Sequence, residues 1–205
     1  MSRDPAIDGY DQEAPDLVGR FEAIDPAMVY APVADLLPAA PTDMLEVGAG
    51  TGRDAAWFAR RGWRVTAVEP AAGLREAGRA LHEGDAIDWI DDRLPGLEAT
   101  LALGRTFPFV LLTAVWHHLD EDARGAALGP LAALLAPGGR LLLSIRHEPE
   151  GSAWHSFAAD PDHTVGAAEA LGLSLAARRH CQSVSPENRA AGVTWTWLAF
   201  DRPRA

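Results

Sequence analysis

The chain has 205 residues, of which 48% are hydrophobic and 23% are charged, and this composition is typical of one globular domain. Its 29 acidic and 18 basic residues give a formal net charge of −11, which disfavours nucleic acid as a partner because phosphates are also negative. All the basic residues are arginine, which excludes Schiff-base chemistry and the lysine of a phosphate-binding P-loop. The one cysteine, Cys181, excludes an internal disulfide and a multi-cysteine zinc site.

The chain carries no targeting signal that composition can reveal. No apolar stretch approaches the ~18 residues that a membrane-spanning helix needs. The acidic first residues are unlike a signal peptide or a basic transit peptide. We therefore expect a cytoplasmic protein without a membrane partner.

From residue 43 onward, predicted strands alternate with predicted helices. The strands are expected at 43–50, 63–70, 87–92, 107–115, 140–149, 173–184 and 193–202. The helices between them are expected at 53–62, 72–84, 94–104, 121–139 and 164–172. Such alternation predicts an α/β fold with a doubly wound, Rossmann-like sheet that is mostly parallel. The short connection at 185–192 predicts that the last two strands form an antiparallel pair.

The N-terminal part does not follow this alternation. Residues 1–26 are expected to be a loop with one possible short helix, and residues 27–38 a helix that ends at Pro38. We expect one domain over 1–205, in which an N-terminal helical segment, 1–41, precedes the core fold, 42–205.

Three glycines, Gly48, Gly50 and Gly52, lie on alternate positions where the first strand passes into a helix. Glycine weakens both kinds of element, so the turn indicates a ligand that approaches bare backbone. Ligands of doubly wound sheets lie beyond the carboxyl ends of the strands, at this place. The dinucleotide fingerprint Gly-x-Gly-x-x-Gly fails here, because Arg53 or Ala55 stands where its third glycine is required.

The run from Glu46 to Gly52 resembles the first motif of the class I S-adenosylmethionine-dependent methyltransferases. Further features of that family follow in order over roughly residues 42–200. They are an acid ending the second strand, acids after the third, an aromatic residue and histidines after the fourth, and a Pro-Gly-Gly turn before the fifth. The resemblance implies the seven-stranded class I methyltransferase fold.

The resemblance also implies a cofactor, S-adenosyl-L-methionine, and a set of residues to hold it. These residues are Glu46, Gly48, Ala49, Gly50, Gly52, Arg53, Glu69, Asp91, Asp92 and Ala114. Glu46 would lie near the methionine ammonium, Glu69 would accept the ribose hydroxyls, and Asp91 or Asp92 would lie near the adenine. Spacing leaves open which of the two aspartates does so, and both also fit an ordinary turn before a proline. Glu46 and Glu69 have a strand-end acid and a turn cap as their alternatives, and Asp54 is expected to be a helix-start charge.

The candidates for catalysis are His117, His118 and His147, with packing or capping as the alternative interpretation. His147 could form an acceptor pocket with Trp154, His155 and Phe157, although these also fit an ordinary surface loop. Trp195 and Trp197 are expected to pack in the core. A histidine metal site is rejected, because no helix spacing supports it.

The predicted function is a methyltransferase that acts on a small-molecule acceptor, because the core fold leaves no added domain to grip a macromolecule. Tyr10, Arg20 and Tyr30 could belong to a lid over the cofactor. The alternatives are a non-catalytic domain that binds S-adenosylmethionine or S-adenosylhomocysteine and, less favoured, a nicotinamide-dependent oxidoreductase. The acceptor, the methylated atom, the need for a general base and the oligomeric state do not follow from the sequence.

Overall fold

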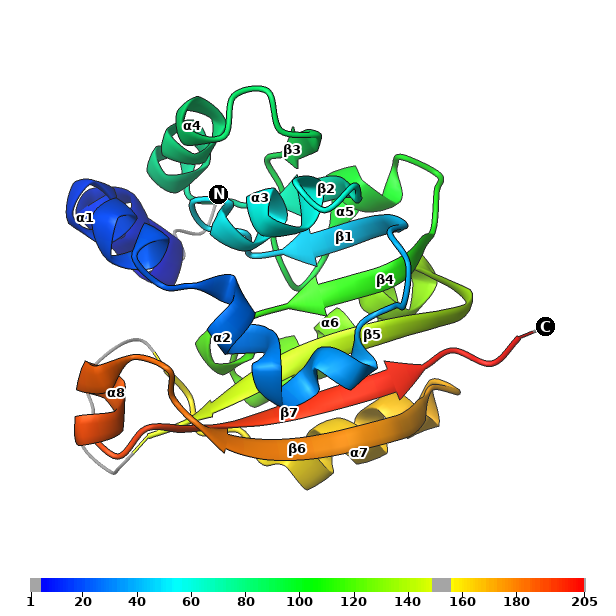
Figure 1. Ribbon diagram of the computed structural model, residues 1–205. Coiled ribbons are helices and arrows are strands. Elements are labelled where there is room, and N and C mark those ends of the chain that lie inside the picture. Colours follow the sequence, from blue (N-terminus) through cyan, green and yellow to red (C-terminus); the bar gives the residue numbers. More distant parts are fainter. Residues whose placement is uncertain (1–4, 149–155, 205) are drawn as a thin grey trace.

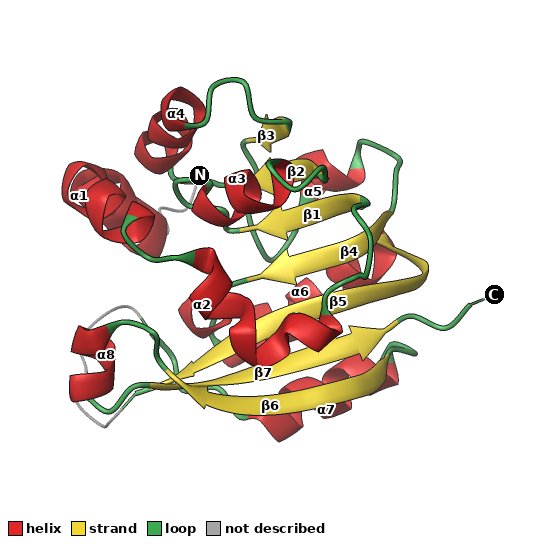
Figure 2. Cartoon of the chain, in the orientation of Figure 1, coloured by secondary structure: helices red, strands yellow, loops and turns green. Residues whose placement is uncertain are grey.

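The computed structural model describes residues 5–148 and 156–204, which form a seven-stranded sheet with helices on both faces (Figures 1 and 2). The sheet order is β3-β2-β1-β4-β5-β7-β6, and only β7 runs antiparallel to its neighbours. The strands are β1 (Asp43–Val47), β2 (Arg64–Val68), β3 (Ile87–Ile90), β4 (Phe107–Leu112), β5 (Leu135–His147), β6 (Ser174–Gln182) and β7 (Thr194–Asp201). The predicted fold class, with its antiparallel C-terminal pair, is confirmed.

The helices that connect these strands cover both faces of the sheet. The α-helices are α1 (Pro5–Glu22), α2 (Pro26–Tyr30), α3 (Arg53–Ala59), α4 (Ala72–Leu81), α5 (Glu98–Leu101), α6 (Glu121–Leu134), α7 (Pro161–Ala170) and α8 (Pro186–Ala190), and the 3-10 helices are η1 (Ala31–Leu36) and η2 (Trp116–His118). In Figure 1, α2 and η1 lie in front of the sheet, with α6 and α7 behind it. Tyr30 and Phe58 pack on the front face, whereas Leu128 and Leu131 pack on the back.

The N-terminal segment contradicts the prediction of a loop, because residues 5–22 form the helix α1. The helix contains Gly9 and Pro15, so local propensity alone disfavours it. Its stability comes from tertiary packing, since Ala14 and Leu17 bury their side chains against Ala71 and Leu74 at the start of α4.

The helix expected at 27–38 is instead two short pieces, α2 and η1. Pro32 lacks an N–H group and cannot continue the α-helical hydrogen bonds, and Val33 leaves helical geometry with φ −129° and ψ 16°. The helix expected at 121–139 ends at Leu134, and its last five expected residues open β5. Leu135 pairs with Phe107 of β4 there, so sheet pairing overrides the helical pattern.

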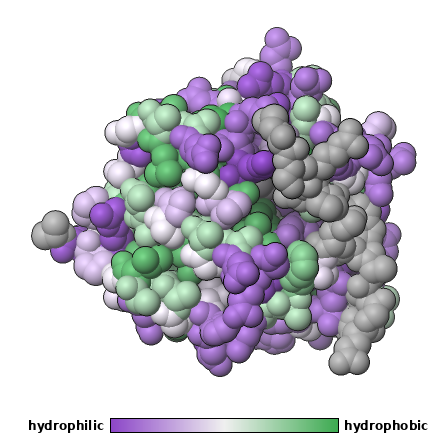
Figure 3. All heavy atoms as spheres, turned by 180° about the vertical axis from the view of Figure 1, so that it is seen from behind, coloured by the Kyte–Doolittle hydropathy of each residue, from purple (hydrophilic) through white to green (hydrophobic). Residues whose placement is uncertain are grey.

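The direction of the strands shows on which side of the molecule the carboxyl ends of the parallel strands lie. In Figure 1 the arrowheads of β1, β4 and β5 all point toward the side that carries α1 and α8. Seen from behind, the surface of the molecule carries hydrophilic side chains mixed with hydrophobic ones (Figure 3). Among the described residues, no helix combines the length and apolarity that crossing a membrane demands.

Candidate active site

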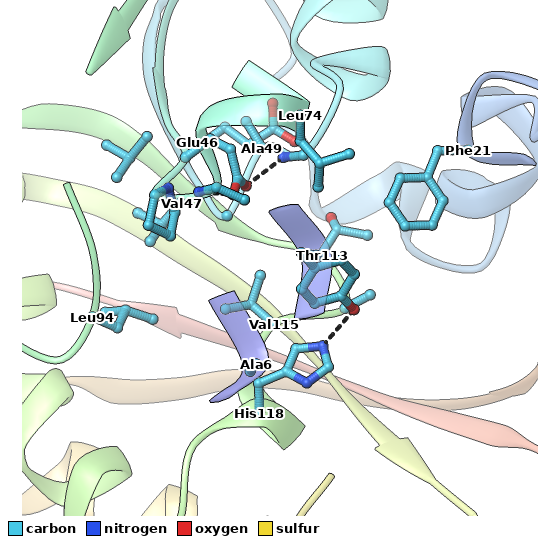
Figure 4. Close-up of a pocket in the computed structure, with 18 of the residues that line it drawn as sticks. Ala6, Phe21, Glu46, Val47, Ala49, Leu74, Leu94, Thr113, Val115 and His118 are labelled. Carbon is cyan, nitrogen blue, oxygen red and sulfur yellow. Dashed lines mark hydrogen bonds between the residues drawn. The ribbon is translucent and has the colours of Figure 1, made fainter. Parts of the chain in front are cut away.

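Two adjoining cavities lie at the carboxyl ends of the parallel strands. The inner cavity has a volume of about 320 Å³ and lies against the loops that follow β1, β2, β3 and β4 (Figure 4). Its wall contains these sequence-predicted residues: Glu46, Gly48, Ala49, Gly50, Arg53, Glu69, Asp92, Ala114, His117 and His118. The fold therefore brings residues from the loops after four strands to one site, as expected at the carboxyl edge of such a sheet.

Two glycines of the turn after β1 have no room for a side chain, and a different neighbour fills the space at each of them. Gly48, Gly50 and Gly52 all have positive φ, between 57° and 76°. A Cβ on Gly48 would come within 2.3 Å of a methyl group of Val115, so this position lies close to the loop after β4. A Cβ on Gly52 would instead meet the Trp89 ring at 2.6 Å. The side of Gly52 where a Cβ would lie therefore faces β3, and Gly52 lies outside the cavity wall, so its predicted contact with a cofactor stays a prediction.

Glu69 is anchored by backbone groups on both sides. One carboxylate oxygen accepts a hydrogen bond from the Gly50 N–H at 2.7 Å, and the other accepts one from the Ala71 N–H at 2.8 Å. The residue is 6% exposed, and this burial raises the pKa of its carboxyl to about 7. Each oxygen retains a second lone pair that can accept a further hydrogen bond from a ligand.

Glu46 is the second buried acid of the inner cavity. It is 3% exposed, and its Oε2 atom has no hydrogen-bond partner among the described residues. Burial, and then the nearby Asp54, raise the pKa of Glu46 well above its usual range. An unpartnered buried carboxylate oxygen is costly unless a ligand satisfies it, so this atom indicates a bound donor or cation.

Arg53 and Asp54 form a buried ion pair beside Glu46. The Arg53 guanidinium donates to both oxygens of Asp54, at 2.7 and 2.9 Å. Asp54 also accepts a hydrogen bond from the Tyr30 hydroxyl at 2.7 Å, and that hydroxyl lies 3.0 Å from the Thr113 hydroxyl. Asp54 does lie in the first turn of α3, yet it also lines the cavity and joins α3 to α2 through Tyr30.

The structure separates the two candidate aspartates after β3. Asp92 lines the inner cavity and accepts hydrogen bonds from the Thr100 N–H at 2.8 Å and the Thr100 hydroxyl at 2.7 Å. The Asp91 side chain is 70% exposed, pairs with Arg75 at 2.9 Å and lies outside the cavity wall. Strand β3 ends at Ile90, and the side chains of the next two residues lie in different places. Spacing in the sequence alone could not tell which of the two aspartates lines the cavity.

Ala114 is held in an unusual backbone conformation at the end of β4. Its φ is +59°, a left-handed value that a residue with a Cβ rarely adopts. The Ala114 N–H donates to the hydroxyl of Ser144, a buried residue of β5, at 2.8 Å. Backbone strain of this kind concentrates at functional sites, and Ala114 lies in the wall of the inner cavity.

The three candidate histidines have different places. His117 and His118 follow β4 in η2, line both cavities and have ring centroids 4.1 Å apart. His147 lies outside the walls of both cavities and bonds the Thr196 hydroxyl at 2.8 Å. Its side chain thus joins β5 to β7, and its candidacy for catalysis stays a prediction.

The outer cavity has a volume of about 670 Å³ and lies between the N-terminal helices and the turn around α8. Arg20, Met28, Arg146 and Asn188 line it, together with the pair of histidines of η2. Sequence reasoning missed Arg146 and Asn188 as site residues. A charged residue, Arg146, near the end of a largely apolar strand could have indicated a site residue, whereas nothing in the sequence marks Asn188.

The N-terminal helix contributes Tyr10 and Phe21 to both cavities. The Tyr10 hydroxyl lies 2.9 Å from His118 Nε2, so α1 is linked to the loop after β4 (Figure 4). Tyr30, the third residue expected in a lid, is instead 1% exposed and lies in the core.

The aromatic residues after β5 and on β7 differ in whether they lie in the core, beside a cavity or at the surface. Trp197 packs in the core as expected, whereas Trp195 lines the inner cavity. Phe157 is half exposed, and its N–H bonds the His117 carbonyl at 2.7 Å. Trp154 and His155, expected in an acceptor pocket, lie outside the described residues.

Comparison with known proteins gives a family and a fold. Residues 20–191 match the family model described as a methyltransferase domain. An uncharacterised methyltransferase of Mycobacterium tuberculosis strain H37Rv is 31% identical over 67% of this chain and 53% of its own length. A ubiquinone biosynthesis O-methyltransferase of Bradyrhizobium sp. is 35% identical over 56% of this chain and 42% of its own length. The chain thus spans about half the length of these relatives.

Solved structures share the fold at lower identity. The 1,6-didemethyltoxoflavin-N1-methyltransferase of Burkholderia thailandensis, bound to its substrate and S-adenosylhomocysteine, has a TM-score of 0.72 at 24% identity. That likeness covers 96% of this chain and 87% of the other. The N-methyltransferase NodS of Bradyrhizobium japonicum, bound to S-adenosylhomocysteine, has a TM-score of 0.67 at 16% identity, over 94% of this chain and all of its own. The chain therefore belongs to the methyltransferase-domain family, and its fold is that of the class I S-adenosylmethionine-dependent methyltransferases.

Proposed function

We propose that this protein binds S-adenosylmethionine in the inner cavity and transfers its methyl group to a small molecule held in the outer cavity. The observation that carries the proposal is the pair of buried carboxylates, Glu46 and Glu69, on one wall of the inner cavity. S-adenosylmethionine is cationic at its sulfonium and ammonium groups and carries no phosphate. A cationic ligand would favour the ionised forms of these two acids, whose pKa values burial raises in the ligand-free protein.

The same wall disfavours a nicotinamide dinucleotide. Its pyrophosphate would approach the turn that follows β1, where Glu46 is buried just before Gly48. Arg53 also stands where the dinucleotide fingerprint requires glycine, and its guanidinium is occupied by Asp54. Like charges at that position would cost binding energy, so an oxidoreductase is the weaker assignment.

The residues fit the cofactor group by group. The unpartnered oxygen of Glu46 would accept a hydrogen bond from the methionine ammonium. Glu69 is fixed by Gly50 and Ala71, so it would accept the two ribose hydroxyls without moving. Asp92 lines the same cavity and would lie near the adenine. When bound, the sulfonium supplies an electrophilic methyl group, and the protein then needs to align the acceptor and exclude water.

The outer cavity supports a small acceptor. It shares His117 and Arg146 with the inner cavity, so an acceptor there would reach the cofactor. Its volume of about 670 Å³ lies in the range of pockets that bind small molecules. We propose that α1 serves as a lid, because Tyr10 lines both cavities and contacts His118.

The proposal is tested by calorimetric titration with S-adenosylmethionine, S-adenosylhomocysteine, NAD and NADP. Both adenosyl compounds should bind and both nicotinamide nucleotides should not. Glu69→Ala should weaken adenosyl binding at least tenfold, which is about 1.4 kcal/mol. Glu169→Ala is the matched control, because Glu169 is an exposed residue of α7 outside both cavities.

Each alternative has its own result in this experiment. Binding of NAD without binding of the adenosyl compounds would refute the cofactor assignment. Adenosyl binding that Glu69→Ala leaves unchanged would refute the role of that carboxylate.

A further inference from the structure

His117 occupies the boundary between the two cavities. It follows β4 in η2, is 5% exposed and contributes to the wall of each cavity. Its Nδ1 atom has no hydrogen-bond partner among the described residues. A buried ring nitrogen without a partner is rare in a folded protein, and here it borders the space where a ligand would lie.

The surroundings of His117 keep its ring neutral. The charged and titratable groups that face it are His118 in η2, Arg124 in α6 and Arg146 in β5. Burial, followed by these neighbours, lowers the pKa of His117 well below its usual range. Glu148 and Tyr10 line the outer cavity nearby, and Glu148 pairs with Arg146. The Trp195 ring packs edge-on at 5.9 Å.

We propose that Nδ1 of His117 takes the proton of the methyl acceptor, which therefore carries an O–H or N–H at the atom that is methylated. The inference rests on the proposed function and deepens it by naming the substrate class. The carrying observation is the buried, unpartnered Nδ1 at the junction of the two cavities.

The step balances in atoms and charge. The acceptor oxygen or nitrogen forms a bond to the methyl carbon, and the carbon–sulfur bond breaks with its electron pair remaining on sulfur. The proton of the acceptor passes to Nδ1 of His117, and water removes it after the product leaves. The sulfonium becomes a neutral thioether as the imidazole becomes an imidazolium. The net charge of the site is therefore unchanged, which offsets the cost of a cation beside Arg146.

The other histidines are less suited to this role. His118 already has its Nε2 atom 2.9 Å from the Tyr10 hydroxyl. His147 is bonded to Thr196 and lies outside both cavities. His117 thus combines an unpartnered nitrogen with access to each cavity.

The first test needs no acceptor. Protein with ¹⁵N-labelled histidine, bound to S-adenosylhomocysteine, is studied by NMR between about pH 6 and pH 8. The His117 resonances are assigned by their loss in His117→Asn. We expect an unprotonated Nδ1 on a neutral ring throughout this range. A hydrogen on Nδ1, or an imidazolium near neutral pH, would overturn the proposal.

The second test compares two methyl acceptors, catechol and thiophenol, which differ in how much methyl transfer depends on a base that removes a proton. Methyl transfer from S-adenosylmethionine to catechol requires loss of a hydroxyl proton, whereas thiophenol ionises by itself at mildly alkaline pH. His117→Asn should lower the catechol rate by on the order of 100-fold and make it rise with pH, since hydroxide must then take the proton. The thiophenol rate should change by less than about threefold. Equal losses for both probes would show a structural role only.

Control measurements separate this inference from the proposed function. His163→Asn is the matched control, because His163 is an exposed residue of α7 that pairs with Glu121. Binding of S-adenosylhomocysteine is measured for every variant. Absence of that binding in the unmodified protein would refute the proposed function itself. Intact binding with a protonated Nδ1 would refute the role of His117 alone.

Discussion

The walls of the inner and outer cavities are built in different ways. The inner wall comes mainly from loops that follow adjacent parallel strands, so sheet pairing fixes the positions of Glu46, Glu69 and Ala114. The outer wall comes from α1, η2, β5 and the turn around α8, which are distant in sequence. The difference shows that short motifs at strand ends form the inner wall, whereas segments distant in sequence form the outer wall.

The largest expected effect comes from the inner wall, with Gly48→Ala. The new Cβ would lie 2.3 Å from Val115, and alanine would be forced to a φ of 75°. We expect a loss of about 1–3 kcal/mol in the free energy of unfolding. Affinity for S-adenosylhomocysteine should fall by more than about tenfold. Denaturant unfolding and calorimetry measure these two quantities.

The control for that substitution is Gly125→Ala. Gly125 lies inside α6, and a Cβ there would meet no atom within 4 Å. Because alanine favours a helix more than glycine does, the variant should be more stable by up to about 1 kcal/mol. If both variants lost cofactor affinity alike, the tightness of the glycine turn would not be the cause.

A pH-dependent effect at the inner wall is expected from the titration of Glu69. The pKa of its carboxyl is about 7 in the folded protein, against 4.5 for an unperturbed glutamate. Because the folded pKa is raised, this group's contribution to stability is fully present below pH 4.5 and is lost as the pH rises through about 7. The loss corresponds to about 3 kcal/mol in the ligand-free protein. Urea unfolding from pH 4.5 to pH 8 should show a fall in stability, and Glu69→Gln should remove the part that Glu69 contributes, while the raised pKa of Glu46 leaves the rest.

Ligand binding should show the opposite dependence on pH. The carboxylate form of Glu69 accepts the ribose hydroxyls better than the neutral acid does, so affinity for S-adenosylhomocysteine should rise up to about pH 7 and then level off. A pH-independent affinity in the unmodified protein would contradict the placement of the ribose beside Glu69.

The smallest effect is expected at the outer wall, with Tyr10→Phe. The substitution removes the hydroxyl that lies 2.9 Å from His118 Nε2 and leaves the ring in place. Docking of α1 should weaken by about 1 kcal/mol, which faster amide hydrogen exchange over residues 5–22 would report. Affinity for S-adenosylhomocysteine should change by less than about threefold. A loss as large as that of Gly48→Ala would show that the two walls do not act separately.

Sequence reasoning reached the inner wall because its signals are local. A glycine at positive φ and an acid at a strand end are visible within a few residues, and the alternation of elements places those ends together. Two predicted residues of that region, Gly52 and Asp91, lie outside the wall of the inner cavity, and the cofactor role predicted for each stays a prediction. Gly52 faces Trp89 and Asp91 faces Arg75, and neither direction follows from spacing.

Sequence alone thus predicted the alternation of strands and helices, the antiparallel C-terminal pair and the glycine turn, because backbone periodicity and turn geometry encode them. The resemblance to a family supplied the other predicted residues of the inner wall. Only the tertiary structure decided the outer wall. Helix α1 exists through its packing on α4, and Tyr10, His117 and Arg146 meet only after the chain has folded. Contacts between residues more than a hundred positions apart, such as Tyr10 with His118, depend on how whole elements pack, and no local pattern records that packing.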